Sequence, residues 1–381
     1  MWLCYNPNSM RSQRGRESGK CLRLALLACG LALLAFPQKQ KKEENQVLQL
    51  PKELPSVVEG ETRRLTFYVT PLSAKGLLSR QIRDALAALT RQAKGDTILK
   101  IRAFVAGSGD GRRVRDLVSE VFTDRKQPLP VLSLVQAGAL PEGAQVVFEA
   151  IADARKEVNP HGLAFVSAQP ASADDPTGPV PPLADRSLAA LAQAVTAAGS
   201  QAADVVRISC FLSSLDDLAA IRKRVVHDYP GAAADFVQPQ RNPVRALAAC
   251  EAVANLRRDP GKPLDLMNPP ALETFAGASD VALVASPKVV LTGTQVSFGF
   301  EENDARLAFQ RLSKALEQAG VSLHDVAFAH FYPLAAGLAT QVRKVRGDFF
   351  DSAHPPASSL LLFEGLPSMN AGFAVDVVAA K

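Results

Sequence analysis

Residues 308–332 read AFQRLSKALEQAGVSLHDVAFAHFY, and this stretch sets the pattern from which the fold can be predicted. Apolar residues recur at helical spacing in its first half, a glycine breaks the helix, and the period then shortens to two. The stretch therefore predicts an amphipathic helix that runs into a β-strand. The same pattern occurs at 81–104 (QIRDALAALTRQAKGDTILKIRAF) and at 188–212 (LAALAQAVTAAGSQAADVVRISCFL). Three copies of one pattern indicate an internal repeat.

Each copy continues with a second helix-like stretch and ends in a closing segment. The helix-like stretches lie near 113–122, 215–229 and 338–350. The closing segments span 132–152, 234–254 and 358–379. In each closing segment we expect a hairpin of two strands, with an acid on the second strand. The acids are Glu149, Glu251 and Asp376.

The spacing of landmarks agrees between the copies. Pro141 precedes Glu149 by the same eight residues that separate Pro243 from Glu251, and the third copy has one residue more. We therefore predict three units of one α+β type. They span 62–155 (degenerate), 156–258 and 271–381. Proline and charged residues are frequent at 257–270, which predicts a linker.

The first 45 residues differ from the rest of the chain. They hold eight Lys or Arg against three Glu, which accounts for the net charge of +5 of all 381 residues. The neutral remainder argues against a nucleic-acid partner. The thirteen apolar residues at 24–36 are too few for a spanning helix and are typical of a signal peptide. We predict that 1–45 is a signal peptide with a basic flank and that the protein is exported, periplasmic or secreted. The alternative is an uncleaved anchor, which would be the only membrane contact.

Two cysteines, Cys210 and Cys250, lie in apolar strand-like runs of the body of the chain. They could pair in an oxidising compartment. We favour buried free thiols from the sequence, because free cysteine is common in protein cores.

Two further motifs belong to the repeat. A strand ends in Ser167-Ala168-Gln169 in the second unit and in Thr292-Gly293-Thr294-Gln295 in the third, and the last strand of the first unit ends Phe148-Glu149-Ala150-Ile151-Ala152. In this order and spacing they resemble the Rid family (reactive intermediate deaminase, also called YjgF-like or endoribonuclease L-PSP). The resemblance covers roughly 62–381.

Rid proteins are homotrimers of one chorismate-mutase-like domain, with a ligand cleft between neighbouring subunits. The resemblance implies an α+β fold of three tandem units, each a mixed sheet with two helices on one face. It further implies that the units form an intramolecular pseudo-trimer, so that the protein is a monomer.

In deaminating members an Arg grips the substrate carboxylate and a Glu on the last strand positions the attacking water. The resemblance makes Glu251, Glu149 and Asp376 catalytic candidates, although a strand acid can also simply bond backbone amides. The place of the Arg is held by Leu132, Ala234 and Ser358. The candidate ligand-binding residues are Arg241, Ser167, Gln169, Thr292 and Gly293. Arg241 could replace the missing Arg or be a solvated loop residue.

These observations leave three functions open. The first is hydrolysis of a small imine or enamine by a divergent Rid protein. The second is a pseudo-trimer that binds a small molecule without catalysis, and the third is a chorismatase-like hydrolase. We expect no cofactor and no metal, because no cysteine or carboxylate completes a ligand set with His324 and His330.

Overall fold

The computed structural model describes residues 51–107, 111–273 and 277–381. The predicted signal peptide or anchor at 1–45 lies outside these residues. Residues 50–381 belong to one structural unit, whose described residues form six α-helices and three mixed β-sheets. In the described part of the chain, no helix is long and apolar enough to cross a membrane.

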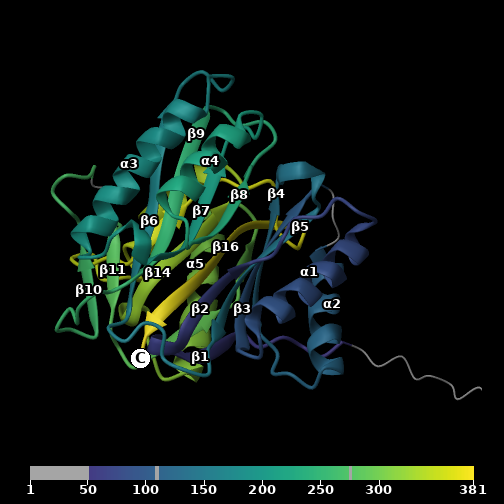
Figure 1. Cartoon of the computed structure of the whole chain (residues 1–381), viewed down its shortest axis with the longest axis horizontal. Coiled ribbons are helices and arrows are strands. Elements are labelled where there is room, and N and C mark those ends of the chain that lie inside the picture. The colour runs from purple at the N-terminus through teal and green to yellow at the C-terminus, as the bar shows by residue number, and fades with distance from the viewer. Residues whose placement is uncertain (1–50, 108–110, 274–276) are drawn as a thin grey trace, which may run out of the picture. The chain divides into compact units, whose positions relative to one another are not determined.

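The first sheet has the strand order β2-β5-β3-β4. Its strands are β2 (Leu65–Val69), β3 (Thr97–Ala106), β4 (Val131–Ala137) and β5 (Val146–Asp153). The helices α1 (Leu78–Ala93) and α2 (Gly111–Asp124) lie side by side over this sheet (Figure 1). Their apolar residues form a core with one face of the strands.

The second sheet has the order β10-β11-β6-β9-β7-β8. Its strands are β6 (Leu163–Ala173), β7 (Val205–Leu212), β8 (Ala233–Val237), β9 (Ala246–Asn255), β10 (Leu264–Met267) and β11 (Val281–Val284). The helices α3 (Pro181–Ala197) and α4 (Leu218–Asp228) pack on one face of it.

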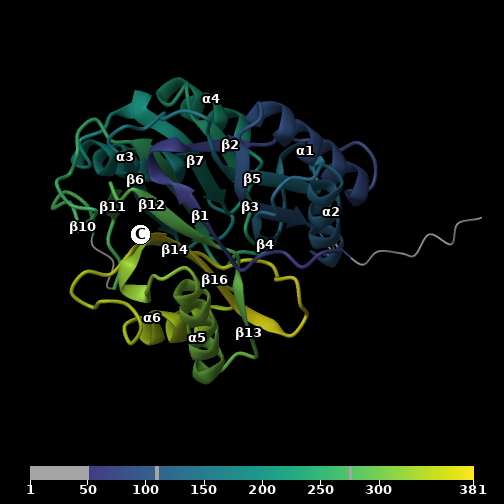
Figure 2. The same cartoon turned by 90° about the horizontal axis from the view of Figure 1, so that it is seen from below.

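The third sheet has the order β1-β12-β16-β14-β15, and β13 also pairs with β16. Its strands are β1 (Val57–Glu61), β12 (Lys288–Thr292), β13 (Gln295–Phe298), β14 (Val326–Pro333), β15 (Ala357–Leu360) and β16 (Ala371–Ala380). The helices α5 (Glu302–Gln318) and α6 (Ala336–Arg346) cover one face (Figure 2). The predicted helix-to-strand order is thus confirmed in all three copies.

The two strands of each closing segment do not form the predicted hairpin. β4 pairs in parallel with β3, while β5 pairs antiparallel with the other side of β3. In the same way, β7 lies between β8 and β9, and β14 lies between β15 and β16. The helices α2, α4 and α6 provide the crossovers that these parallel pairs require. The hairpin prediction was wrong because alternating apolar residues identify strands but not their partners.

Two strands pair outside the unit in which their sequence falls. β11, within the predicted third unit, pairs antiparallel with β6 of the second sheet. β1, which precedes the predicted first unit, pairs along its whole length with β12 of the third sheet (Figure 2). The predicted linker at 257–270 contains β10, which extends the second sheet through β11. The linker prediction was wrong for these four residues, whose backbone is paired.

The faces of the sheets that point away from the helices pack against one another. One shared apolar cluster includes Phe165 of β6 and Phe328 of β14, together with residues of the first sheet. Another includes Phe104 of β3, Phe211 of β7 and Tyr332 of β14. The ring centroids of Phe104 and Phe211 lie 5.9 Å apart. All three sheets therefore bury apolar surface in a common interior, which stabilises their association.

A disulfide bond joins Cys210 on β7 to Cys250 on β9. The two residues lie directly opposite each other in the antiparallel register, with 4.1 Å between their Cα atoms, and both are buried. The free-thiol interpretation was wrong. The sequence reveals two buried cysteines, but only the pairing of β7 with β9 brings them into contact.

Candidate functional site

The three repeated acids lie in the common interior, within one buried cluster of charges. Glu251 and Asp376 are 0% exposed and Glu149 is 3% exposed. Arg102 on β3 donates to both carboxylate oxygens of Glu149, at 2.7 and 2.8 Å, and to Glu251 Oε1 at 2.7 Å. Arg207 on β7 donates to the same two acids, at 3.2 and 2.8 Å. The two arginines thus join the acids of β5 and β9.

Asp376 enters the cluster from β16. Its carboxylate contacts Lys100 Nζ and accepts a hydrogen bond of 2.9 Å from the Tyr332 hydroxyl. His330 Nδ1 lies 3.2 Å from the same carboxylate, and His330 Nε2 lies 3.1 Å from Glu251 Oε1. The imidazole therefore bridges the acids of β9 and β16.

The cluster is assembled from equivalent positions of the three sheets. Each central strand places one polar residue directly opposite the repeated acid on the last strand. These opposed pairs are Arg102 with Glu149, Ser209 with Glu251, and His330 with Asp376. Each central strand also has a register irregularity near its start. The sequence repeat and the strand registers therefore agree.

The surrounding cations keep the acids ionised. Burial alone would raise the pKa of Glu149, but the charges of Arg102 and Arg207 outweigh it and lower this pKa to about 2. In the same way, Arg102 and His330 hold the pKa of Glu251 well below its usual range. Lys100 and His330 also lower the pKa of Asp376. These paired carboxylates lie between strands of all three sheets and are at most 3% exposed.

A fourth acid, Asp235 on β8, lies beside the cluster in a different charge state. Its exposed fraction is 4%. Burial, and then the adjacent charge of Glu149, raise the pKa of Asp235 well above its ordinary value. Asp235 is therefore neutral when its neighbours are ionised.

Replacing Asp235 by asparagine is expected to stabilise the protein at neutral pH. The folded-state pKa of Asp235 lies above its unfolded value of 3.8, so the folded protein retains a proton that the unfolded chain releases. The stability due to this carboxyl is present at low pH and is lost as the pH rises from about 3.8 toward the folded pKa. Urea unfolding of Asp235→Asn should show a higher midpoint than wild type at about pH 7.5 and a smaller dependence on pH. The exposed control Asp124→Asn should follow wild type. An Asp235→Asn protein that is less stable than wild type at that pH would contradict the assignment.

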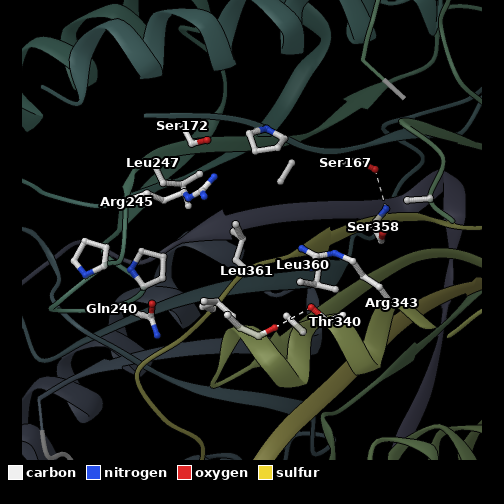
Figure 3. Close-up of a pocket in the computed structure, with 18 of the residues that line it drawn as sticks. Ser167, Ser172, Gln240, Arg245, Leu247, Thr340, Arg343, Ser358, Leu360 and Leu361 are labelled. Carbon is white, nitrogen blue, oxygen red and sulfur yellow. Dashed lines mark hydrogen bonds between the residues drawn. The ribbon is translucent and has the colours of Figure 1, made fainter. Parts of the chain in front are cut away.

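A cavity of about 490 Å³ lies between the second and third sheets. β6 and the loop before β9 line one side, and α6 and β15 line the other. Figure 3 shows Arg245 and Arg343 on opposite sides of this cavity, with Leu360 and Leu361 between them. A cavity of this size suits a small-molecule ligand.

Three arginines line the cavity, one of which, Arg245, lies 3.8 Å from a carboxylate oxygen of Asp174. Arg245 comes from the loop before β9, and Arg343 and Arg346 come from the end of α6. Arg346 is only 5% exposed, and burial together with the nearby charge of Arg343 lowers its pKa to about 10. It therefore remains a cation at neutral pH. Asp280 also lines the cavity, and burial raises its pKa. Two cations on one helix beside leucine side chains favour an anionic ligand with an apolar part.

Ser167 and Gln169, two predicted ligand-binding residues, lie at or near this cavity. Ser167 lines it, but its hydroxyl donates to Ser279 O at 2.6 Å and accepts from Ser358 N at 2.8 Å (Figure 3). Gln169 is buried and donates to Ser167 O at 3.2 Å. Both side chains thus form hydrogen bonds to backbone groups at the cavity wall.

The other predicted ligand-binding residues lie elsewhere. Thr292 Oγ1 accepts a backbone hydrogen bond of 2.9 Å from β16. Gly293 packs against Leu132, and a Cβ atom at this glycine would lie 2.9 Å from Leu132 O, so a side chain would not fit without a shift. Arg241 lies outside the cavity lining, and its backbone N–H donates to Glu364 at 2.9 Å.

The sequence did not predict several cations of the charge cluster and of the large cavity. Lys100 and Arg102 stand in the otherwise apolar run TILKIRAFVA of β3, and such charges inside a buried strand were an available signal. Arg343 and Arg346 carried no signal, because arginines near the end of an amphipathic helix are usually solvated. In the part of the chain that the structure describes, no group of His, Cys, Asp and Glu side chains is arranged to hold a metal ion.

Comparisons with known proteins find similarity to solved structures. No family model matches the chain, and no curated protein does. The Rid family protein YyfB of Yersinia pestis is 17% identical, with a TM-score of 0.30, over 32% of this chain and 100% of its own. A YjgF/YER057c/UK114 family member from Mycobacterium tuberculosis is 21% identical, with a TM-score of 0.23, over 31% of this chain and 99% of its own. A YjgF family protein from Neisseria meningitidis is 13% identical, with a TM-score of 0.24, over 31% of this chain and 94% of its own.

Proposed function

We propose that the chain is a covalent pseudo-trimer of three Rid-like units that binds a small organic anion in the cavity between its second and third units. The equivalent registers of β3, β7 and β14 with their final strands support the three-unit arrangement. Two strand pairings support it as well, because β1 joins the start of the first unit to the third sheet and β11 joins the third unit to the second sheet.

The observation that carries the binding proposal is the composition of the cavity wall. Three arginines line the cavity, while Glu149, Glu251 and Asp376 do not. Those acids are instead neutralised in the interior. The arginines that face the cavity are suited to holding an anion, and Asp280 is the only carboxyl among the described residues that line it.

Ser358 stands where the family's anion-binding Arg is expected, so the arginines that bind the anion must come from elsewhere. It lines the cavity at the place where the Rid resemblance expects an Arg. Arg343 and Arg346 approach the same cavity from α6. A guanidinium can pair with a carboxylate in bidentate fashion, so these two side chains can take over the anchoring role. Leu247, Leu360 and Leu361 offer an apolar surface for the rest of the ligand.

The two hydrolytic alternatives, a Rid-type hydrolase of imines or enamines and a chorismatase-like enzyme, require an acid in contact with the substrate. Glu251 lies just behind the cavity wall. Ser359 Oγ contacts its carboxylate and accepts a hydrogen bond of 3.1 Å from Ala168 N. Hydrolysis would be favoured instead if freshly generated imines or chorismate were turned over by the protein and not by Glu251→Gln.

Replacing Arg343 by alanine is expected to weaken anion binding about tenfold or more, because a charge-assisted pair is lost. The measurement is calorimetric titration with benzoate, phenylpyruvate, indole-3-acetate and chorismate, each beside its methyl ester. At least one acid should bind, and its ester should bind more weakly. Arg115→Ala, an exposed arginine on α2 outside the cavity, is the matched control and should bind like wild type. Equal affinities of the two variants, or of acid and ester, would count against the proposal.

We further propose that the protein is exported and that 1–45 directs this step. The disulfide Cys210–Cys250 supports the proposal, because structural disulfides persist mainly in oxidising compartments. A fusion of the full chain to a reporter that is active only outside the cytoplasm tests it, with a fusion that starts at residue 46 as the control.

A further inference from the structure

A second, much smaller cavity lies inside the charge cluster. Its volume is about 20 Å³, which is enough for a single water molecule or an ion of similar size. The polar side chains that line it are Lys100, Arg102, Arg207, His330 and Glu149. The remaining walls are apolar, with Phe165 and Phe328 among them. Four of these five polar side chains are thus basic, and one is acidic.

Two buried donors at this cavity lack acceptors. Arg102 Nη1 and Arg207 Nε have no hydrogen-bond partner among the residues that the structure describes. The two residues are 3% and 5% exposed and line the cavity. A buried N–H group of a charged side chain without an acceptor is costly, and nearly all such groups in folded proteins are satisfied. An acceptor in the cavity would remove this cost.

The charges of the cluster do not balance without a further anion. Both nitrogens of His330 face carboxylate oxygens, at 3.2 and 3.1 Å, and an imidazole can donate hydrogen bonds to two carboxylates at once only in its cationic form. Burial lowers the pKa of Lys100, but the adjacent carboxylate of Asp376 favours its charged form. With Arg102 and Arg207, four cations then face the three ionised acids, because Asp235 is neutral. One positive charge remains in a region of low dielectric, where it is unfavourable.

We propose that the small central cavity binds one monovalent anion of the size of chloride, held by the N–H groups of Arg102 and Arg207. A water molecule could accept the same hydrogen bonds but would leave the positive charge in place. The site is independent of the larger cavity and of the ligand proposed there, because it lies in the interior that joins the three sheets.

Chloride is expected to stabilise the protein in a saturable manner. Thermal unfolding is measured in sodium chloride and in sodium gluconate of equal ionic strength, so that screening is the same in both. Chloride should raise Tm by at least about 2 °C. A crystal equilibrated with sodium bromide should show an anomalous-scattering peak between Arg102 and Arg207. Equal Tm values in the two salts, or bromide only at surface positions, would mean that the cavity holds water and would overturn the proposal.

A variant that fills the cavity separates ion binding from general salt effects. Val378 lines the cavity, and Val378→Ile adds one methylene group there without changing a charge. This variant should lose the chloride-dependent rise in Tm. Val289→Ile adds the same group to the same apolar cluster away from the cavity and should keep the rise. If Val378→Ile keeps it, or if both variants lose it, the proposed site is wrong. The bromide measurement on wild type provides the answer even if Val378→Ile does not fold.

Discussion

Replacing Glu251 by glutamine should lower the free energy of unfolding by about 3–5 kcal/mol, the usual cost of removing one partner from a buried ion pair. Glu251 is fully buried and accepts hydrogen bonds from Arg102 and Arg207 at 2.7 and 2.8 Å. Glutamine keeps the shape of the side chain but cannot neutralise these cations or His330. The loss of charge therefore leaves buried positive groups without compensation. Urea unfolding followed by circular dichroism measures the change.

An exposed pair provides the control for this prediction. Glu142 accepts a hydrogen bond of 2.8 Å from Arg222, but its side chain is 60% exposed. Exposed pairs contribute little, typically under about 1 kcal/mol, so Glu142→Gln should unfold almost like wild type. If Glu251→Gln were as stable as Glu142→Gln, the charge cluster would not hold the sheets together. A catalytic role of Glu251 would then regain support.

Reduction of the disulfide Cys210–Cys250 should destabilise the folded protein by about 2–4 kcal/mol. The bond connects β7 and β9 and encloses α4 and β8, so its loss frees a long segment of the unfolded chain. Unfolding in urea with and without dithiothreitol measures the difference. The double variant Cys210→Ala, Cys250→Ala should be less stable than the oxidised protein and insensitive to the reductant. A wild-type protein that unfolds identically in both conditions would contradict this prediction.

The elements of the fold could largely be predicted, because their signals are local. Residues 308–332 contain a helical period followed by an alternating one, and the structure has α5 and β14 there. The partners of the strands could not be predicted. Nothing in the sequence of β11 distinguishes pairing with β6 from pairing with β12, since either neighbour would bury its apolar residues.

The candidate site was predictable only in part. The repeat located Glu149, Glu251 and Asp376 at equivalent positions, and the structure brings them together. The groups that neutralise them come from other strands and include a cation of another sheet in each case: Arg207 for Glu149, Arg102 for Glu251 and Lys100 for Asp376. Pairing over such separations depends on how the sheets associate, and a single sequence contains no local trace of it.

The pairing of β1 with β12 has a consequence for how the chain matures. β1 ends at Glu61, and the strand that completes its hydrogen bonds begins only at Lys288. During synthesis from the N-terminal end, β1 therefore has no strand partner until β12 has been made, and an unpaired strand edge is prone to aggregation. The third sheet can therefore be completed only when β1 and β12 are both available, so that its closure is a late step of folding.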